Sequence, residues 1–273
     1  MKLSSPGKVY LIGAGPGAQD LMTLRGAKIL EKADIVFYDA LVSSQMLELC
    51  PNAKLVAVGK RCGKLSTAQK FIDKQLVDAA KKYQTVVRLK GGDPMIFGRA
   101  DEEMTALAQE GIEFEIVPGI TSALAAAASV QSSLTLRGVS RSVAFVTVAK
   151  ASETLATSSI PNADTLIYYM GRQDGHLIAE QLIQSGRNQH TPVVVVEAIS
   201  TDNERRLFTD LKGLQSELLQ EWCNPQFPAL LMIGEAFTKV CEQENQLRAN
   251  LPLSELNDAL QNSFAFSHGR RSA

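Results

Sequence analysis

Residues that could take part in chemistry lie where three short apolar strands are predicted to end. A buried strand is predicted at Thr85–Leu89. It must end before Gly91–Pro94 (Gly-Gly-Asp-Pro), because this sequence fits neither a strand nor a helix. Asp39 and Lys60 each follow another apolar run. Open α/β sheets bind ligands at the carboxyl ends of their strands, and paired glycines let backbone groups approach a flat ligand, so the sequence indicates a ligand site here. Taken alone, such a turn is more often an ordinary connection between a strand and a helix.

A second glycine loop, Gly13–Gly17, follows an apolar strand at Val9–Ile12. It differs from a dinucleotide-binding fingerprint because its third glycine comes one position early. Pro16 also removes a backbone donor from the loop that would have to hold a phosphate. The loop therefore disfavours NAD or FAD as the ligand.

The elements that must position these residues alternate regularly in the first part of the chain. Five apolar strands are separated by helical segments, which favours a parallel sheet with helices on its faces. After the glycine turn, the segment Arg99–Glu103 is typical of the first turn of a helix, where acidic residues suit the helix dipole. The strands are expected at Val9–Ile12, Ile35–Tyr38, Leu55–Val58, Thr85–Leu89 and Phe114–Val117.

Pro118 and Gly119 interrupt this alternation and are predicted to form a domain boundary. Thr121 and Ser122 can then cap a helix of small residues that packs closely against its neighbours. The second part has fewer helices per strand, so its sheet is expected to be mixed. Its strands are expected at Val143–Val148, Thr165–Tyr169, Val193–Glu197, Arg206–Thr209 and Ala229–Ile233, and its helices near Leu177–Ser185 and Leu211–Glu221.

The domain organisation that follows is α/β throughout. We expect an N-terminal α/β domain at residues 1–117, a C-terminal α/β domain at 118–240 and a polar tail at 241–273. From Thr238 onward the composition becomes polar, with one weak helix signal at Ser254–Gln261, so this end of the chain is expected to be loosely held.

Composition argues against several classes of partner. The 28 Lys and Arg residues balance 29 Asp and Glu residues to a formal charge of -1, so no global basic field suggests nucleic acid. The first residues lack a signal-peptide core, and no apolar run approaches the roughly 20 residues that span a bilayer. A cytoplasmic protein without a membrane partner is therefore expected. The 4 cysteines and 3 histidines form no CxxC or HxxxH pair, so neither a metal nor a disulfide is indicated.

Seven motifs occur in the order in which tetrapyrrole methylases carry them: VYLIGAGPG, YDALVS, VGKR, VRLKGGDPMIFGRADEE, VPGITSALAA, LTLRGVSRSV and YYMG. From about Gly7 to Val240 the chain therefore resembles this family. VGKR and the glycine-turn motif are the most similar to the uroporphyrinogen-III C-methyltransferase branch. The resemblance implies two α/β domains, S-adenosylmethionine (SAM) in a cleft between them, and a homodimer.

The resemblance also implies roles for individual residues. Asp39 matches the position of a proton acceptor, and Lys60 matches that of a proton donor. Two methyl groups would pass from SAM to ring carbons of uroporphyrinogen III, releasing S-adenosylhomocysteine and giving precorrin-2, the branch compound for sirohaem, cobalamin-type corrinoids and haem d1. Cofactor contacts would fall on Pro16, Gly91, Gly92, Asp93, Ile96, Thr121, Ser122 and Met170.

A tetrapyrrole rich in carboxylates requires a local cluster of cations on a protein of near-neutral charge. Arg99 and Arg137 are the first candidates for binding this substrate, because the planar guanidinium suits carboxylates. Glu102 would orient Arg99 or contact a pyrrole N–H. Alternatively, Arg99 and Arg137 are solvated surface residues without a role in binding. Asp39 could instead cap a turn, and Met170 could instead belong to the core.

The chain departs from the family pattern at two places. The family commonly has G-I-P-L-T-H-R where this chain has Gln131–Arg137, and a glycine within the loop that here reads Glu197–Thr201. The first departure removes a histidine that the family could use in substrate binding, and the second alters a cofactor contact. We expect no fused dehydrogenase or chelatase domain, so the reaction would stop at the methylated product. A later precorrin or cobalt-precorrin methyltransferase, and a non-catalytic nucleotide-binding protein, are the alternatives.

Overall fold

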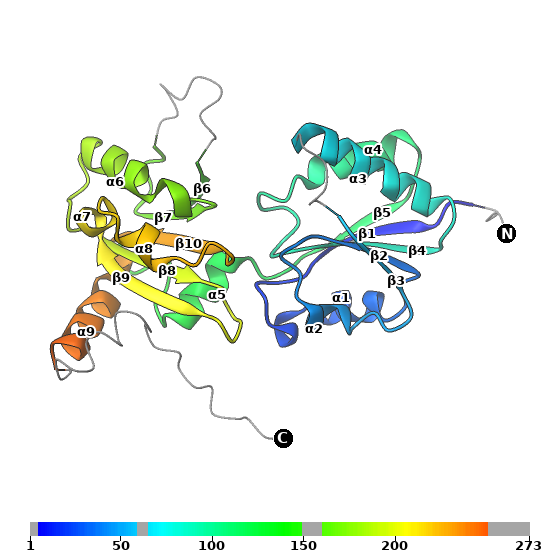
Figure 1. The fold of residues 1–273 in the computed structure, drawn as a ribbon. Helices are drawn as coiled ribbons and strands as arrows, with labels where there is room; N and C mark the ends of the chain where they lie inside the picture. Colours follow the sequence, from blue (N-terminus) through cyan, green and yellow to red (C-terminus); the bar gives the residue numbers. More distant parts are fainter. Residues whose placement is uncertain (1–4, 59–64, 149–159, 251–273) are drawn as a thin grey trace. The chain divides into compact units, whose positions relative to one another are not determined.

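The computed structural model describes residues 5–58, 65–148 and 160–250 (Figure 1). Their contacts divide the chain into two compact units, Met1–Ser122 and Ala123–Ala273. The predicted boundary at Pro118 and Gly119 lies a few residues earlier, in the same loop. Within the described ranges, no helix has both the length and the apolar character that crossing a bilayer requires.

The first unit is a parallel sheet with helices on both faces. Its five strands have the order β3-β2-β4-β1-β5, and each neighbouring pair is parallel. The strands are β1 Lys8–Gly13, β2 Ile35–Tyr38, β3 Lys54–Ala57, β4 Thr85–Lys90 and β5 Phe114–Val117. The helices are α1 Leu24–Leu30, α2 Ser44–Leu47, α3 Leu65–Ala80 and α4 Ala100–Gln109, with a 3-10 turn at Gln19–Leu21.

Side chains of β4 alternate between the two faces of the sheet, and helices cover both faces. Val86 packs with Leu76 of α3 and Leu107 of α4, whereas Val87 packs with Leu30 of α1 on the other face. Figure 1 shows α3 and α4 on one side of this sheet and α1 and α2 on the other. Because both faces are covered, most residues of the central strands are apolar, which is why these strands could be recognised as apolar runs; Arg88 and Lys90 of β4 are buried exceptions.

The second unit contains a mixed sheet, as predicted. Its strand order is β6-β7-β10-β8-β9; β6 and β7 are parallel, and the remaining pairs are antiparallel. The strands are β6 Val143–Thr147, β7 Thr165–Tyr169, β8 Pro192–Glu197, β9 Arg205–Asp210 and β10 Ala229–Ile233. The helices are α5 Ser122–Ser129, whose first residue ends the first unit, α6 Gly175–Gln184, α7 Leu211–Leu214, α8 Leu218–Trp222 and α9 Thr238–Ala249, with 3-10 turns at Arg172–Asp174 and Glu235–Phe237.

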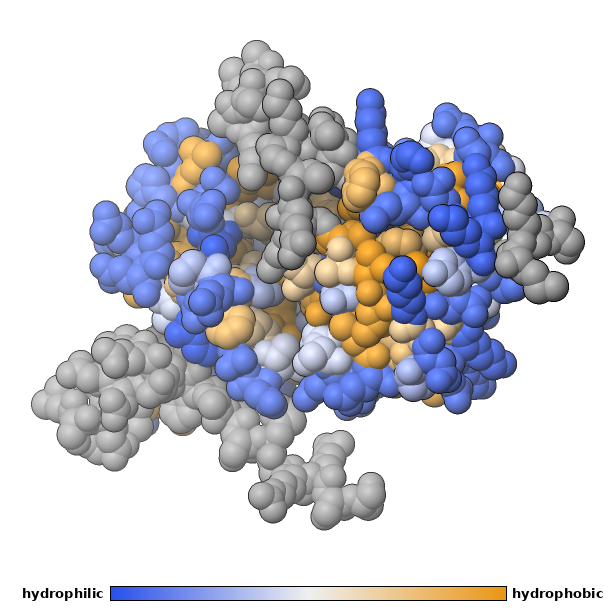
Figure 2. All heavy atoms as spheres, turned by 45° about the vertical axis from the view of Figure 1, so that its right-hand side comes forward, coloured by the Kyte–Doolittle hydropathy of each residue, from blue (hydrophilic) through white to orange (hydrophobic). Residues whose placement is uncertain are grey.

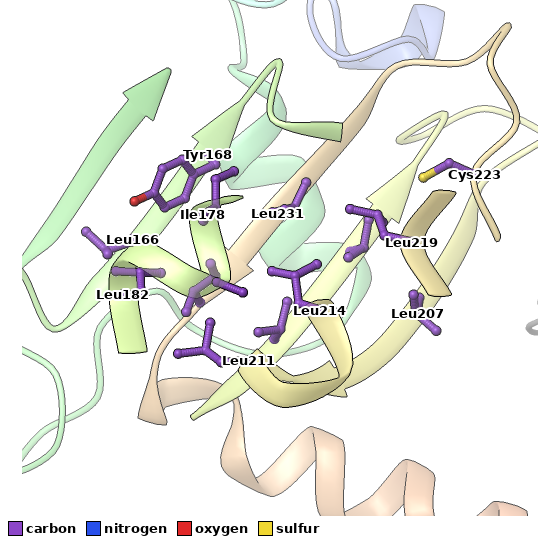
Figure 3. Packing of buried hydrophobic residues seen from close by; sticks show 14 of the residues in the cluster. Leu166, Tyr168, Ile178, Leu182, Leu207, Leu211, Leu214, Leu219, Cys223 and Leu231 are labelled. Atoms are coloured by element: carbon purple, nitrogen blue, oxygen red, sulfur yellow. The ribbon is translucent and has the colours of Figure 1, made fainter. Parts of the chain in front are cut away.

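The core of the second unit lies between its sheet and the helices α6, α7 and α8 (Figure 3). Leu182 of α6 is fully buried and belongs to the same cluster as Leu231 of β10 and Trp222 of α8. Figure 3 shows Leu182, Leu211 and Leu214 pointing into this shared apolar layer. The helices are therefore held by burial of their apolar faces rather than by their own short length.

Two predicted elements were wrong. The single helix expected at Leu211–Glu221 is interrupted between α7 and α8, because the Ser216 hydroxyl donates to Gly213 O (2.6 Å) and accepts from Leu218 N (3.3 Å). The segment expected to be loosely held from Thr238 is helical as far as Ala249, and Cys241 within it is buried. The helix signal at Ser254–Gln261 lies outside the described residues.

Leu182→Ala tests the packing of α6. We expect the free energy of unfolding to fall by about 2–5 kcal/mol, because the substitution leaves a cavity in a fully buried site. Leu177→Ala removes the same atoms from a residue of α6 that is 41% exposed and should change stability by only about 0.5 kcal/mol. Urea denaturation followed by the fluorescence of Trp222, the single tryptophan, measures both. Equal losses would contradict this account of the core.

Candidate functional site

Three loops of the first unit meet through their glycines. Gly92 N donates to Gly15 O (2.7 Å), and Gly15 N donates to Gly92 O (3.1 Å). A methyl group on Gly119 would overlap Gly92 O, and one on Gly13 would lie 2.6 Å from that oxygen. The loops after β1, β4 and β5, three adjacent strands, therefore come into direct backbone contact at the carboxyl end of the sheet.

The two glycines of the turn have different surroundings. A Cβ on Gly92 would have only Thr121 Cα nearby, at 4.0 Å, and would project into open space beside the turn. The φ angle of Gly92 is +67°, which also favours glycine. A Cβ on Gly91 would instead lie 2.8 Å from Leu41 Cβ. Gly92 therefore fits the close approach of a flat ligand, whereas Gly91 is required for packing against Leu41.

The other predicted cofactor residues of this unit lie around the same turn. The Asp93 carboxylate accepts from Met95 N (2.8 Å) and from Gly119 N (2.9 Å), so it joins the turn to the loop after β5. Ile96 N donates to Asp93 O (3.2 Å). Thr121 is buried, Ile96 and Pro16 are half-buried, and Ser122 is the first residue of α5.

Asp39 follows β2, and its carboxylate lies next to this turn. Oδ2 accepts from Gly91 N (3.2 Å), and Oδ1 accepts from Leu41 N (3.0 Å). The second contact is the local turn that was considered as an alternative role, but the first connects two strands of the sheet. The carboxylate therefore lies within hydrogen-bonding distance of the glycine turn while 27% of its side chain stays exposed. Lys60 lies outside the described residues.

Arg99 and Glu102 form a two-pronged ion pair at the start of α4. Arg99 Nε and Nη2 donate to the two carboxylate oxygens of Glu102, at 2.7 and 2.8 Å. This hydrogen bonding raises the pKa of Arg99 and lowers that of Glu102. Arg99 also has a φ of +55°, the left-handed region that non-glycine residues rarely adopt. The pairing in which Glu102 orients Arg99 is therefore present.

Arg137 and Met170 belong to the second unit. Arg137 is exposed in a tight turn that Leu136 N closes by donating to Ser140 O (2.9 Å). Met170 follows β7, is 65% exposed and has a φ of +58°. The core position considered for Met170 is therefore wrong, because a core methionine would be enclosed.

Sequence reasoning missed a buried ionic cluster made by Arg88, Lys90 and Glu103. Arg88 Nε donates to Glu103 Oε1 (2.9 Å), and Lys90 Nζ donates to Glu103 Oε2 (2.8 Å). All three are at most 5% exposed. Burial lowers the pKa of Lys90, and the neighbouring Arg88 adds to this effect. The available signal was two basic residues spaced by two within an apolar strand, since buried charges require partners.

The departure at Gln131–Arg137 lies beside an open groove of about 600 Å³ in the second unit. Gln131, Ser132 and Thr135 line it together with the apolar side chains of Leu124 and Phe145.

Among the residues with described positions, no group of three or more His, Cys, Asp and Glu side chains could hold a metal ion.

Comparison with known proteins identifies the family. A family model for tetrapyrrole (corrin/porphyrin) methylases matches residues 8–215. The chain belongs to the tetrapyrrole methylase family. A uroporphyrinogen-III C-methyltransferase of Pseudomonas aeruginosa is 42% identical over 89% of this chain and 99% of its own. A siroheme synthase of Pseudomonas fluorescens is 42% identical over 85% of this chain and 50% of its own, so the chain spans about half the length of the siroheme synthases it matches.

Solved structures of tetrapyrrole methylases share the fold. A native uroporphyrin III C-methyltransferase from Thermus thermophilus has a TM-score of 0.70 and 34% identity, covering 85% of this chain and 94% of its own. A structure of the enzyme from that organism complexed with S-adenyl homocysteine has a TM-score of 0.69 and 36% identity, covering 84% and 93%. A cobalt precorrin-4 methyltransferase has a TM-score of 0.69 and 29% identity, covering 84% and 95%. The predicted α/β fold class is confirmed.

Gly119→Ala tests the backbone contact in this tetrapyrrole methylase. A methyl group there would overlap Gly92 O and lie 2.7 Å from Gly13 Cα, atoms that cannot move aside separately. We expect the free energy of unfolding, measured by circular dichroism in urea, to fall by about 3 kcal/mol. Gly111→Ala has no atom within 4 Å of the new methyl group but a φ of +65°, and should cost about 1 kcal/mol through backbone strain alone. Similar losses in both variants would contradict the contact.

Proposed function

We propose that this tetrapyrrole methylase transfers two methyl groups from SAM to ring carbons C2 and C7 of uroporphyrinogen III, giving precorrin-2. The observation that carries the proposal is the hydrogen bond from Gly91 N to Asp39 Oδ2, which holds a partly exposed carboxylate beside a turn with open space at Gly92. The near full-length match to a uroporphyrinogen-III C-methyltransferase supports this choice of substrate. A structure of a related enzyme with S-adenyl homocysteine supports SAM as the donor.

The residues around the turn fit the cofactor. When bound, SAM supplies an electrophilic methyl group on a positively charged sulfur. Gly92 would admit the ligand against the backbone, and the tie between Asp93 and Gly119 would keep this surface rigid. Pro16, Gly91, Ile96, Thr121, Ser122 and Met170 are the other residues proposed to contact the cofactor.

Asp39 is proposed to receive a proton. Methylation of a pyrrole carbon leaves a cationic ring, which becomes neutral when a proton leaves it, directly or through water. Two backbone N–H donors orient the Asp39 carboxylate, and its remaining lone pairs are available for that proton. Lys60 is the proposed proton donor, by resemblance alone.

The proposed substrate is a macrocycle of four pyrrole rings that bears carboxylates on its edge. Leu41, Met95 and Phe97 are exposed apolar side chains in the loops that contain Asp39 and the glycine turn, and they would pack against the ring. Figure 2 shows hydrophobic side chains reaching the surface in one broad area bordered by hydrophilic ones. Arg99, oriented by Glu102, and Arg137 are proposed to bind the carboxylates. The resemblance further predicts a cytoplasmic homodimer, and light scattering of the purified protein tests the dimer.

A second candidate is a methylase that acts later in corrinoid synthesis, because the cobalt precorrin-4 methyltransferase shares the fold at 29% identity. Anaerobic incubation with SAM and uroporphyrinogen III, followed by mass spectrometry, separates the two. We expect a dimethylated product and release of S-adenosylhomocysteine. No turnover of uroporphyrinogen III, with turnover of a precorrin, would reject the proposal. Tight binding of NAD without binding of S-adenosylhomocysteine would instead indicate a nucleotide-binding protein of another class.

Two substitutions separate chemistry from cofactor binding. Asp39→Asn keeps an acceptor oxygen for a backbone N–H but is a far weaker base, so turnover should fall by about 100-fold or more while the Kd for S-adenosylhomocysteine changes little. Gly92→Leu should abolish that binding in calorimetry, because its side chain would occupy the open space. Gly111→Leu, with a φ of +65° and no atom near its Cβ, is the matched control. Normal binding by Gly92→Leu would exclude the turn as the cofactor site.

A further inference from the structure

The buried ionic cluster of Arg88, Lys90 and Glu103 carries more positive than negative charge when its groups are ionised. One carboxylate faces an ammonium and a guanidinium, so the three groups together have a net charge of +1. A further anion, Asp39, lies beside the cluster, with its Oδ2 4.0 Å from Arg88 Nη2. Because an uncompensated buried charge is costly, the Asp39 carboxylate helps to offset the positive charge of this cluster.

The guanidinium of Arg88 is fixed on three sides. Nε donates to Glu103 Oε1, and Nη1 donates to the backbone oxygens of Leu89 (3.0 Å) and Phe37 (3.4 Å). Phe37 lies on β2, the strand that Asp39 follows. Since a guanidinium is planar, these contacts also fix where Nη2 points, which is toward the Asp39 carboxylate.

We propose that Arg88 is a positioning residue for Asp39, and that Glu103 holds Arg88 in the orientation this requires. The inference rests on the proposed function, in which Asp39 receives the proton. Lys90 occupies the second oxygen of Glu103, and its backbone oxygen accepts from Ala14 N (2.7 Å) at the base of the glycine loops. The cluster therefore lies behind the Asp39 carboxylate on the buried side of the sheet.

The hydrogen exchange of the Gly91 and Gly92 amides distinguishes a positioning role for Arg88 from a purely structural one. Gly91 N donates to the Asp39 oxygen that faces Arg88, whereas Gly92 N donates to the backbone oxygen of Gly15. If Arg88 holds the Asp39 carboxylate in place, its loss frees the Gly91 amide and leaves the Gly92 amide protected. General destabilisation would expose both amides together.

Hydrogen exchange of these two amides, followed by NMR in Arg88→Met, tests the proposal without any substrate. We expect Gly91 exchange to rise about tenfold while Gly92 exchange stays within about twofold. Arg187→Met is the matched control, because Arg187 also donates to two backbone oxygens, those of Ala163 and Asp164, and belongs to the other unit. Unchanged Gly91 exchange, or equal acceleration of both amides, would overturn the proposal.

Kinetics provide the second readout. In Arg88→Met we expect kcat to fall by about 100-fold, with KM and the Kd for S-adenosylhomocysteine within about threefold, as for a misplaced but present base. Arg88→Lys keeps the buried charge but lacks the planar fork, so it should recover only part of kcat, and it replaces Arg88→Met if that variant does not fold. Wild-type kcat in both variants would overturn the proposal. Failure of the wild-type protein to methylate uroporphyrinogen III would reject the proposed function, while the exchange experiment would still test Arg88.

Discussion

The contact among the backbones of Gly13, Gly92 and Gly119 is the constraint on which the first unit depends. It brings the loops after three adjacent parallel strands so close that no side chain fits between them. The same contact leaves the outer side of Gly92 open, because the turn is supported from within by Gly15 and Asp93. Rigidity and access thus arise from one arrangement, and the proposed site requires both in order to align an acceptor with a donor.

The cost of burying ions is a second constraint on the first unit, because it requires every buried charge to have a partner. Arg88, Lys90 and Glu103 lie within the face of the sheet that α3 and α4 cover, although their neighbours Val86 and Phe37 are apolar. Replacing such a cluster with apolar residues is often neutral or stabilising, so stability alone is a weak reason to keep it. Its position behind Asp39 gives a better reason, because it places a fixed charge beside the carboxylate that is proposed to receive the proton.

Much of the fold could be predicted because buried strands appear in the sequence as apolar runs between turn residues. The bounds of β7 and β10 were predicted as the structure has them, since both are apolar runs between turn residues. The break at Ser216 could not be predicted, because it depends on two hydrogen bonds of a single hydroxyl, one donated to Gly213 O and one accepted from Leu218 N. The helix α9 was missed because its sequence is largely polar, and Cys241 is the one buried residue among those of α9 whose burial is described.

In the candidate site, too, the features that depend on specific polar contacts could not be predicted from the sequence. The turn at Gly91 and Gly92 could be predicted because two adjacent glycines followed by Asp-Pro end a strand, and its contact with Asp39 follows from the adjacency of β2 and β4. The ionic cluster was not evident, because a buried arginine and a surface arginine look alike in sequence until the partner is known. The roles of the individual site residues remain predictions.

The left-handed backbone at Arg99 has an evolutionary consequence. A non-glycine residue in this region costs about 1–3 kcal/mol, and glycine at the same position would cost far less. Mutation under selection for folding alone would therefore drift toward glycine at the first position before α4. An arginine there marks a place where the protein forgoes stability to keep a cation fixed at the edge of its sheet, and consensus design aimed at heat resistance should leave it alone.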